Sequence, residues 1–343
     1  MTKNIKKNPK SIFITFNQTN DLFCCGLHNG FKIINCDPFE EKLNRTFQET
    51  GISKIEILNR SNVMVFVGDG TSTNFPLTKV FLWDDYVYKC ILKLEHDEDV
   101  LGVKINLEYI FTVTKNKAYI HNSKTGRTVH TIETYPNQKG LLSICSDTFS
   151  TVIAIPGLKK GSVRVRNFSQ DNEFDQEIIA HEHEIEQIQL NSDGSMIATA
   201  SEEGTLIRVI ESQTGKEIKQ FRRGAKKAKI YSLAFDENSE FLAATSSSGT
   251  IHIFRLTPKK EKKQSEKKNK RGETGTERSV MKTKIPNKEY CVCGFDKSSN
   301  LFVVTIDGSF YKFYVDKANR QIKQVKEMYK QFLNIHDEKE KEK

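Results

Sequence analysis

Features that would mark a membrane-spanning or secreted protein are missing from this sequence of 343 residues. No stretch approaches the roughly 18 consecutive apolar residues that a transmembrane helix requires. Residues 1–10 are rich in lysine and are not followed by an apolar segment, so no secretory signal is predicted. We therefore expect a cytoplasmic protein.

Cysteines are few and odd in number, which argues against a disulfide framework. The seven cysteines are scattered over strand-like segments. Cys24-Cys25 and the pair Cys291 and Cys293 could in principle bind a metal, but neither has partner ligands at zinc-finger spacing. We expect buried thiols and no metal site.

Arrangements typical of enzymes are also absent. His96, His121, His130 and His336 have no accompanying nucleophile and carboxylate that would indicate a catalytic triad. No glycine-rich phosphate loop ending in Gly-Lys-Ser/Thr occurs, and the pair Asp84-Asp85 is typical of a solvated turn. The sequence predicts a protein with no catalytic residues and no cofactor.

The net charge of +9 has a local origin. Between Lys259 and Arg271 there are eight basic and two acidic residues, a net +6, so the other 330 residues carry only +3. A nucleic-acid-binding fold would spread its positive charge over the folded surface. The pattern instead favours a flexible arm near an anionic surface, and no nucleic-acid partner is expected.

Short β-branched and aromatic segments, separated by turn residues, predict an all-β protein. A repeat is clearest in the second half, where the pattern of 185–210 recurs about 45 residues later in 230–254 and again in 291–314. A unit of 40–45 residues with three or four strands is the period of a propeller blade. We predict a seven-bladed β-propeller with blades starting near residues 8, 53, 98, 139, 183, 226 and 288.

One domain, residues 8–335, is expected, with two exceptions to its regular pattern. Residues 257–277 contain eight basic residues, two glycines and no aliphatic residue, and are interpreted as a disordered basic loop in blade 6. Residues 336–343 form a charged tail.

The most informative motif is Gln220-Phe-Arg-Arg-Gly224, between the two clearest repeats. Consecutive side chains of a strand point to opposite faces, so Arg222 and Arg223 can serve two ligands on either side of one strand. Guanidinium groups suit phosphate because their planar fork donates two parallel hydrogen bonds. Gly224 would then let the chain turn away. The alternative is that both arginines are ordinary surface charges.

Each arginine has polar neighbours of the kind that a phosphorylated sugar needs. Before Arg222 come His181 and the hydroxyls of Ser201 and Thr205; after Arg223 come the hydroxyls of Ser246 and Thr250, and His252. Thr250 and His252 share strand parity. Arg208 lies three positions beyond Thr205 and would need a β-bulge to point the same way.

The segments Ala180-His181, Ala198–Arg208, Phe221–Gly224, Ile230–Ser232 and Gly249–Phe254 resemble the pattern of the PROPPIN family, WD-repeat β-propellers that interact with phosphoinositides. Further segments, such as Lys79–Asp85 and Asp307–Phe313, resemble the shorter, compact branch of that family. The resemblance extends over residues 8–335, essentially the whole chain.

This resemblance implies binding of phosphatidylinositol 3-phosphate and phosphatidylinositol 3,5-bisphosphate, and no catalysis. By position, one lipid-binding site would comprise His181, Ser201, Thr205, Arg208 and Arg222, and a second Arg223, Ser246, Thr250 and His252. Lys226 and Lys227 could add attraction to an anionic surface, or could be ordinary solvated lysines.

The resemblance also implies a monomeric scaffold in autophagy and endolysosomal traffic, recruited peripherally to phagophore, endosomal or vacuolar membranes. Its expected partners are phosphoinositide-containing membranes and autophagy proteins such as a lipid-transfer protein, to whose binding Asn17 and Pro76–Thr78 could contribute. The alternative is a WD-repeat interaction scaffold that binds no lipid.

One departure from the family concerns the loop 257–277, which often carries membrane-inserting apolar residues in this family. Here it has none, and Val280 and Met281, the nearest apolar residues, are expected in the next strand. We therefore expect the loop to act by electrostatic attraction to an anionic membrane.

Overall fold

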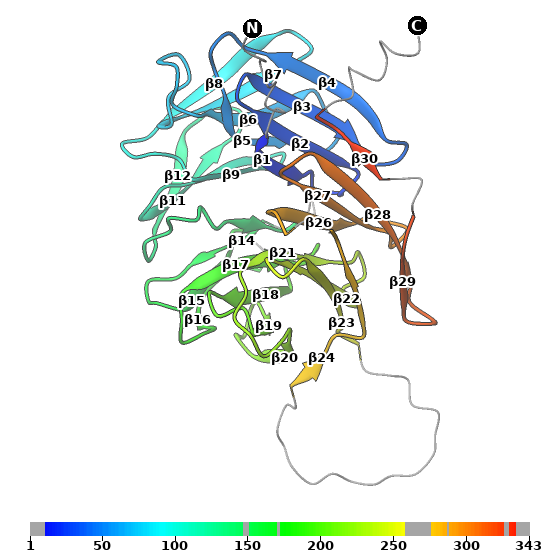
Figure 1. The fold of residues 1–343 in the computed structure, drawn as a ribbon. Helices are drawn as coiled ribbons and strands as arrows, with labels where there is room; N and C mark the ends of the chain where they lie inside the picture. The colour runs from blue at the N-terminus through cyan, green and yellow to red at the C-terminus, as the bar shows by residue number, and fades with distance from the viewer. Residues whose placement is uncertain are drawn as a thin grey trace, which may run out of the picture.

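The protein is a β-propeller of seven sheets, described here from a computed structural model (Figure 1). The structure describes residues 11–146, 151–169, 172–257, 276–286, 288–325 and 329–333. No helix among these residues is long and apolar enough to cross a membrane. The expectation of an all-β, seven-bladed propeller is confirmed.

Each blade is an antiparallel sheet whose four main strands follow one another in the chain. Alternating short strands and tight turns favour this up-and-down order. The first four blades comprise β1 Ser11–Phe16, β2 Leu22–Leu27, β3 Gly30–Asn35 and β4 Glu40–Thr46; β5 Ile52–Ile57, β6 Val63–Gly68, β7 Lys79–Asp84 and β8 Lys89–Glu95; β9 Gly102–Ile105, β10 Tyr109–Val113, β11 Lys117–Asn122 and β12 Thr128–Glu133; and β13 Ser143–Ile144, β14 Val152–Pro156, β15 Ser162–Asn167 and β16 Phe174–Ile179.

The last three blades contain two additions to the four-stranded pattern. A short strand, β24, joins blade 5 in parallel to β20, and β30 pairs with β28 in blade 7. These blades comprise β17 Ile185–Leu190, β18 Met196–Ser201, β19 Leu206–Glu211, β20 Glu217–Arg222 and β24 Glu277–Arg278; β21 Ile230–Phe235, β22 Phe241–Ser246, β23 Thr250–Arg255 and β25 Met281–Lys284; and β26 Cys291–Phe295, β27 Leu301–Thr305, β28 Ser309–Asp316, β29 Gln321–Gln324 and β30 Lys330–Gln331.

Seven hydrophobic clusters lie mostly between adjacent blades. The central strands of each blade are apolar on both faces, which is why they read as nearly continuous hydrophobic runs. Blade 7 packs against blade 1 through Phe302 and Phe310 on one side and Phe16 and Phe23 on the other. Phe332 also joins this cluster, with its ring centroid 5.1 Å from that of Phe23. The ring is therefore closed by side-chain packing between its first and last blades.

The predicted blade starts agree with the first strands to within four residues. The predicted domain, residues 8–335, contains all the described strands, and its exact limits stay a prediction. The predicted loop 257–277 needs one correction, because Glu277 belongs to β24. Residues 258–275 and the tail 336–343 lie outside the described residues, so their predicted disorder is not tested. Met281 is buried in β25, and Val280 packs against the same core.

Candidate functional site

The strand β20 places Arg222 and Arg223 on opposite sides of the outer edge of blade 5. Arg222 ends β20 and lies opposite Leu206 of β19, whereas the preceding Phe221 is fully buried between blades 5 and 6. Because side chains alternate along a strand, Arg222 faces blade 4 and Arg223 faces blade 6. The expected separation of the two guanidinium groups therefore agrees with the strand register.

The group His181, Ser201, Thr205, Arg208 and Arg222, here called site 1, lies where blades 4 and 5 meet. Thr199 is opposite Arg208 in the pairing of β18 with β19, so Ser201, Arg208 and Arg222 share the sheet face that packs on blade 4. The pairing of β18 with β19 contains no register shift. Thr205 precedes β19 in a bend, so strand parity does not relate it to Arg208, and the β-bulge that a shared strand would have required is not needed.

His181 is buried and is held by a residue that the sequence did not point to. Its Nε2 atom lies 3.0 Å from the hydroxyl of Thr199, which is fully buried. Burial, together with the nearby charge of Arg208, lowers the pKa of His181 to about 4. The ring is therefore neutral at pH 7. The parity of Thr199 with Ser201 was the available clue to this residue.

Arg208 and Arg222 differ in how much of their hydrogen-bonding capacity is free. Arg208 donates through Nη1 to the carbonyl oxygen of Ala180, and its Nε lies 3.2 Å from the Glu217 carboxylate. Arg222 is exposed, and no described residue accepts a hydrogen bond from its side chain. Of the two, Arg222 has the guanidinium group that is open to a ligand.

The group Arg223, Ser246, Thr250 and His252, here called site 2, lies where blades 5 and 6 meet. The pairings of β22, β23 and β25 put Ser246, Thr250, His252 and Lys282 on one sheet face. Leu242 and Phe254 of that face pack against Phe221, so the face looks toward blade 5.

Arg223 and His252 are close enough to interact electrostatically. Burial, followed by the charges of Arg223 and Lys282, lowers the pKa of His252 to about 4. The Nδ1 atom of His252 lies 3.1 Å from the hydroxyl of Ser279, and Ser246 hydrogen-bonds Ser248 at 2.9 Å. Sequence reasoning missed Lys282 and Ser279, both of which follow the charged segment. Lys282 reaches site 2 because β25 pairs with β23, and Ser279 reaches it because the chain returns past β20 at β24.

Of the accessory lysines, Lys227 has an acidic partner and Lys226 has none among the described side chains. The Nζ atom of Lys227 lies 2.8 Å from Glu203, and this hydrogen bond raises the pKa of the lysine. Lys226 is exposed. Lys227 therefore offers less net charge to an anionic surface than Lys226.

Gly224 does not have the role that the sequence suggested. Its φ lies outside the left-handed region, and a Cβ atom built there would meet no atom within 4 Å. The glycine that the turn requires is Gly204, with φ of +57°. A Cβ atom at Gly204 would lie 1.8 Å from the carbonyl oxygen of Ala228, so no larger residue fits without a backbone shift.

Asn17, which was expected to contribute to a partner surface, is instead a structural residue. It is buried, and its amide donates to Asp21 at 2.7 Å and to the Asn59 carbonyl at 3.1 Å. Its side-chain oxygen accepts from the backbone of Leu22. Asn17 therefore fixes the turn between the first two strands, while Pro76–Thr78 remains partly exposed.

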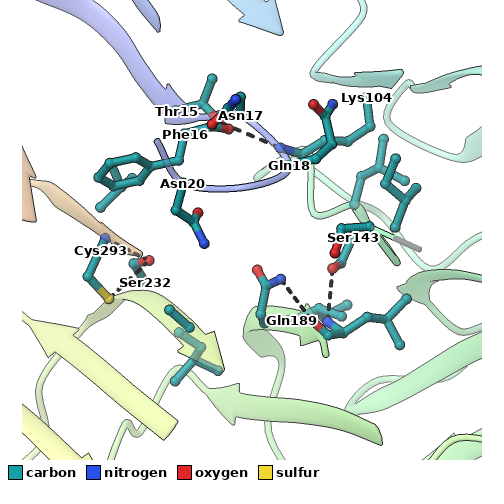
Figure 2. Close-up of a pocket in the computed structure, with 18 of the residues that line it drawn as sticks. Thr15, Phe16, Asn17, Gln18, Asn20, Lys104, Ser143, Gln189, Ser232 and Cys293 are labelled. Carbon is teal, nitrogen blue, oxygen red and sulfur yellow. Dashed lines mark hydrogen bonds between the residues drawn. The ribbon is translucent and has the colours of Figure 1, made fainter. Parts of the chain in front are cut away.

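A cavity of about 380 Å³ is the channel along the propeller axis, and it contains no residue of site 1 or site 2 (Figure 2). It is lined by the innermost strand of every blade. Its polar groups bind their neighbours: Gln18 donates to the Ile105 carbonyl, Gln189 to the Leu190 carbonyl, and Lys104 to Glu56. The channel is a structural feature of blade packing and presents no converging set of unpartnered groups among the described residues.

The cysteine pairs do not form a metal centre in the described part of the chain. None of the seven cysteines, all of which lie in the described ranges, forms a disulfide, and every one except Cys90 is buried. Burial raises the pKa of Cys291 to about 11 and that of Cys293 to about 12, so both remain thiols at neutral pH. His183, Glu202 and Glu203 lie within 4.8 Å of one another at the surface, but Glu203 is engaged by Lys227. The expected absence of a metal stays a prediction.

The fold defines a class of protein, a seven-bladed β-propeller, in which basic and hydroxyl side chains gather on both sides of the end of β20. The model of the family PROPPIN matches residues 10–288, and the chain belongs to that family. It is 32% identical to autophagy-related protein 18e of Arabidopsis thaliana over 92% of the chain and 86% of the plant protein. It is 33% identical to SVP1-like protein 2 of Saccharomyces cerevisiae over 74% of the chain and 64% of that protein.

Solved structures show the same fold at lower identity. Kluyveromyces lactis Hsv2 superposes with a TM-score of 0.75 at 20% identity, over 92% of this chain and 98% of that one. A complex of KlAtg21 with the coiled coil of AgAtg16 gives a TM-score of 0.78 at 23% identity, over 94% and 99% of the two chains. Family membership establishes a non-enzymatic β-propeller scaffold of the phosphoinositide-binding, autophagy-related type.

Proposed function

We propose that this protein binds membranes that carry phosphatidylinositol 3-phosphate or phosphatidylinositol 3,5-bisphosphate, with one headgroup in site 1 and one in site 2. The observation that carries the proposal is that consecutive side chains at the end of β20 point to opposite faces of the sheet. Arg222 faces blade 4 with Arg208 and Ser201, while Arg223 faces blade 6 and acts electrostatically on His252. Each site combines guanidinium, hydroxyl and imidazole groups.

These groups suit an inositol phosphate. A guanidinium group donates two parallel hydrogen bonds to phosphate oxygens, and serine and threonine hydroxyls can donate to the phosphate or pair with ring hydroxyls. A second phosphate on the inositol ring could be met by Lys282, which shares the sheet face of His252. Both sites lie on neighbouring blades of one rigid rim, so binding of a second headgroup becomes intramolecular and can raise avidity by roughly 10².

Vesicle flotation with phosphatidylinositol 3-phosphate, phosphatidylinositol 3,5-bisphosphate or unphosphorylated phosphatidylinositol tests this proposal. The wild type should float with the two phosphorylated lipids, and the Arg222→Ala/Arg223→Ala double variant should not. A matched control is Lys124→Ala/Arg127→Ala, which removes two exposed positive charges from blade 3. Equal flotation of the two double variants would refute the site assignment, and the lipid-free scaffold would then be the better reading.

The basic segment Lys259–Arg271 lies outside the described residues, and its electrostatic role stays a prediction. Each lysine near an anionic leaflet contributes about 1 kcal/mol, screened over about 8–10 Å. Replacing residues 259–271 with glycine and serine should weaken flotation most at low salt. Unchanged binding at low salt would contradict this role.

A protein-docking function on another edge is favoured by exposed apolar residues of blade 2. Tyr86, Val87, Tyr88 and Ile91 are 80%, 49%, 60% and 55% exposed, at the turn between β7 and β8 and on β8. In Figure 1 these strands lie across the ring from β20 and β24. One edge could therefore hold a partner, such as a lipid-transfer protein of autophagy, while the other meets a phagophore, endosomal or vacuolar membrane.

In this proposal the protein acts as a monomer, which light scattering at working concentration would test. Replacing Tyr86 and Tyr88 with serine should abolish capture of such a partner while leaving flotation intact. Loss of flotation in this variant would contradict the separation of the two edges.

A further inference from the structure

The strand β24 brings a distant part of the chain to the two sites. It comprises only Glu277 and Arg278, yet it pairs in parallel with the last two residues of β20. In this register Glu277 lies beside Phe221 and Arg278 beside Arg222. A segment more than 50 residues away in the sequence therefore covers the edge of blade 5 at the motif that separates site 1 from site 2.

The side chains of this segment alternate between the two sites. Glu277 forms an ion pair with Lys219, which has the same strand parity as Phe221 and so faces blade 6. Ser279 also faces blade 6, where its hydroxyl lies 3.1 Å from Nδ1 of His252 in site 2. Since Arg278 stands between them, its side chain points to the opposite face, the face of Arg222 and Arg208.

Two guanidinium groups are thus neighbours on one sheet face at the edge of site 1. Like charges side by side on adjacent strands are unfavourable unless a counter-charge lies between them. Both arginines are exposed, and within the described ranges neither has a carboxylate partner. In contrast, Arg45, Arg164 and Arg166, which also project from outer parts of blades, each have an aspartate within 4.0 Å.

We infer that Arg278 is a further phosphate-binding residue of site 1, acting with Arg222 on the same anion. The inference rests on the proposed function of site 1 and adds a residue to it. Two planar guanidinium forks on one face can donate to different oxygens of one phosphate, which removes the repulsion between them. Ser279 and His252 give site 2 its own contact with the same segment. The segment Glu277–Ser279 thereby takes part in both sites.

A double-mutant cycle tests whether the two arginines share one phosphate. Binding of Arg222→Gln, Arg278→Gln and the double variant would be measured on vesicles with phosphatidylinositol 3-phosphate, with Arg127→Gln as the control of equal charge change. We expect Arg278→Gln to bind about tenfold more weakly than Arg127→Gln, because a charge-assisted hydrogen bond is lost. In the Arg222→Gln background, the further loss on replacing Arg278 should be clearly smaller.

The outcomes distinguish failure of the proposed function from failure of the role of Arg278 alone. If the wild type does not bind these vesicles, or if Arg222→Gln binds as well as Arg127→Gln, the proposed function fails. If Arg222→Gln loses binding but Arg278→Gln equals Arg127→Gln, or if the two losses simply multiply, only the role of Arg278 is overturned.

Two further measurements complete the test. Calorimetry with soluble inositol 1,3-bisphosphate distinguishes headgroup recognition from attraction to the membrane surface. If Arg278 recognises the headgroup, Arg278→Gln should also weaken binding of the soluble headgroup. An unchanged affinity for the soluble headgroup would overturn the role of Arg278.

Should Arg278→Gln melt at a lower temperature than the control, Arg278→Lys would keep the charge but lose the planar guanidinium fork. Intermediate binding by this folded variant supports the inference, and wild-type binding overturns it.

Discussion

The Nε–H of Arg223 donates to the carbonyl oxygen of Gly204 at 2.7 Å. The same guanidinium group also donates through Nη2 to the carbonyl oxygen of Lys226. Arg223 thus joins the turn after β18 to the segment after β20, whereas Arg222 makes no side-chain hydrogen bond with a described residue. Two adjacent arginines of one motif therefore differ in structural importance.

This difference predicts unequal effects of substitution on stability. Arg223→Gln should lower the free energy of unfolding by about 1–2 kcal/mol, since it leaves the Gly204 carbonyl without its donor. Arg222→Gln should change it by less than about 0.5 kcal/mol, as is usual for an exposed residue. Urea unfolding of both variants measures the effect, and equal losses of stability would contradict the assigned contacts.

The two glycines near the motif should also respond differently to alanine. Gly204→Ala should destabilise the protein by more than about 1 kcal/mol, because a Cβ atom would collide with the Ala228 carbonyl at a positive φ. It should weaken vesicle binding as well, since the Gly204 carbonyl positions Arg223. Gly224→Ala has open space and ordinary φ and should be neutral in thermal melts and in flotation. A destabilised Gly224→Ala would show that the flexibility of this glycine is needed after all.

The sequence was sufficient for features that depend on local periodicity. Repeats with strand-length apolar runs predicted seven blades, and the period of two along β20 predicted that Arg222 and Arg223 separate. Each of these predictions depends on patterns within short segments of the chain and on their repetition.

Features that depend on contacts between distant segments were missed. Thr199 meets His181 across a blade interface, and Arg278 reaches Arg222 only through the return of the chain at β24. Gly224 was predicted to let the chain turn because of its residue type, although the observed backbone does not require a glycine at this position. Asn17 was read as a surface residue, because its partners Asp21 and Asn59 cannot be inferred from its own position.

Stability should decrease as the pH falls from about 6.5 to about 4. The pKa of His181 and that of His252 are lowered to about 4 in the folded protein by burial and by nearby arginines, whereas an unfolded histidine has a pKa near 6.5. Between these values the unfolded chain binds protons that the folded protein does not, so acid favours unfolding. Above about pH 6.5 both states are neutral at these positions and the contribution is complete.

Urea unfolding across this pH window checks the prediction. His181→Gln and His252→Gln should each reduce the dependence of unfolding free energy on pH relative to the wild type. Replacing the exposed His28 provides the control. The pKa of His121 is also lowered to about 4, by burial and by the neighbouring His96. His121 should therefore retain part of the pH dependence of the unfolding free energy in both variants. A slope unchanged in both site variants would show that neither ring is held neutral in the folded state.

Replacing Thr199 with valine can separate its structural role from its role in site 1. Thr199→Val keeps the shape but removes the hydroxyl that lies 3.0 Å from Nε2 of His181, which leaves a buried ring nitrogen without its partner. Such a loss costs about 1–3 kcal/mol of stability. Blade 3 offers a matched control in Thr112, a fully buried threonine whose hydroxyl lies 3.2 Å from both His96 and His121. Thr112→Val should lower stability at least as much.

The two threonine variants should differ in lipid binding. Thr199→Val frees the His181 ring at the base of site 1 and should weaken vesicle binding several-fold, whereas Thr112→Val lies in another blade and should bind like the wild type. Thermal melts and flotation at a temperature where both variants are folded make the comparison. If both weaken binding equally, the effect follows stability alone, and Thr199 has no positioning role in site 1.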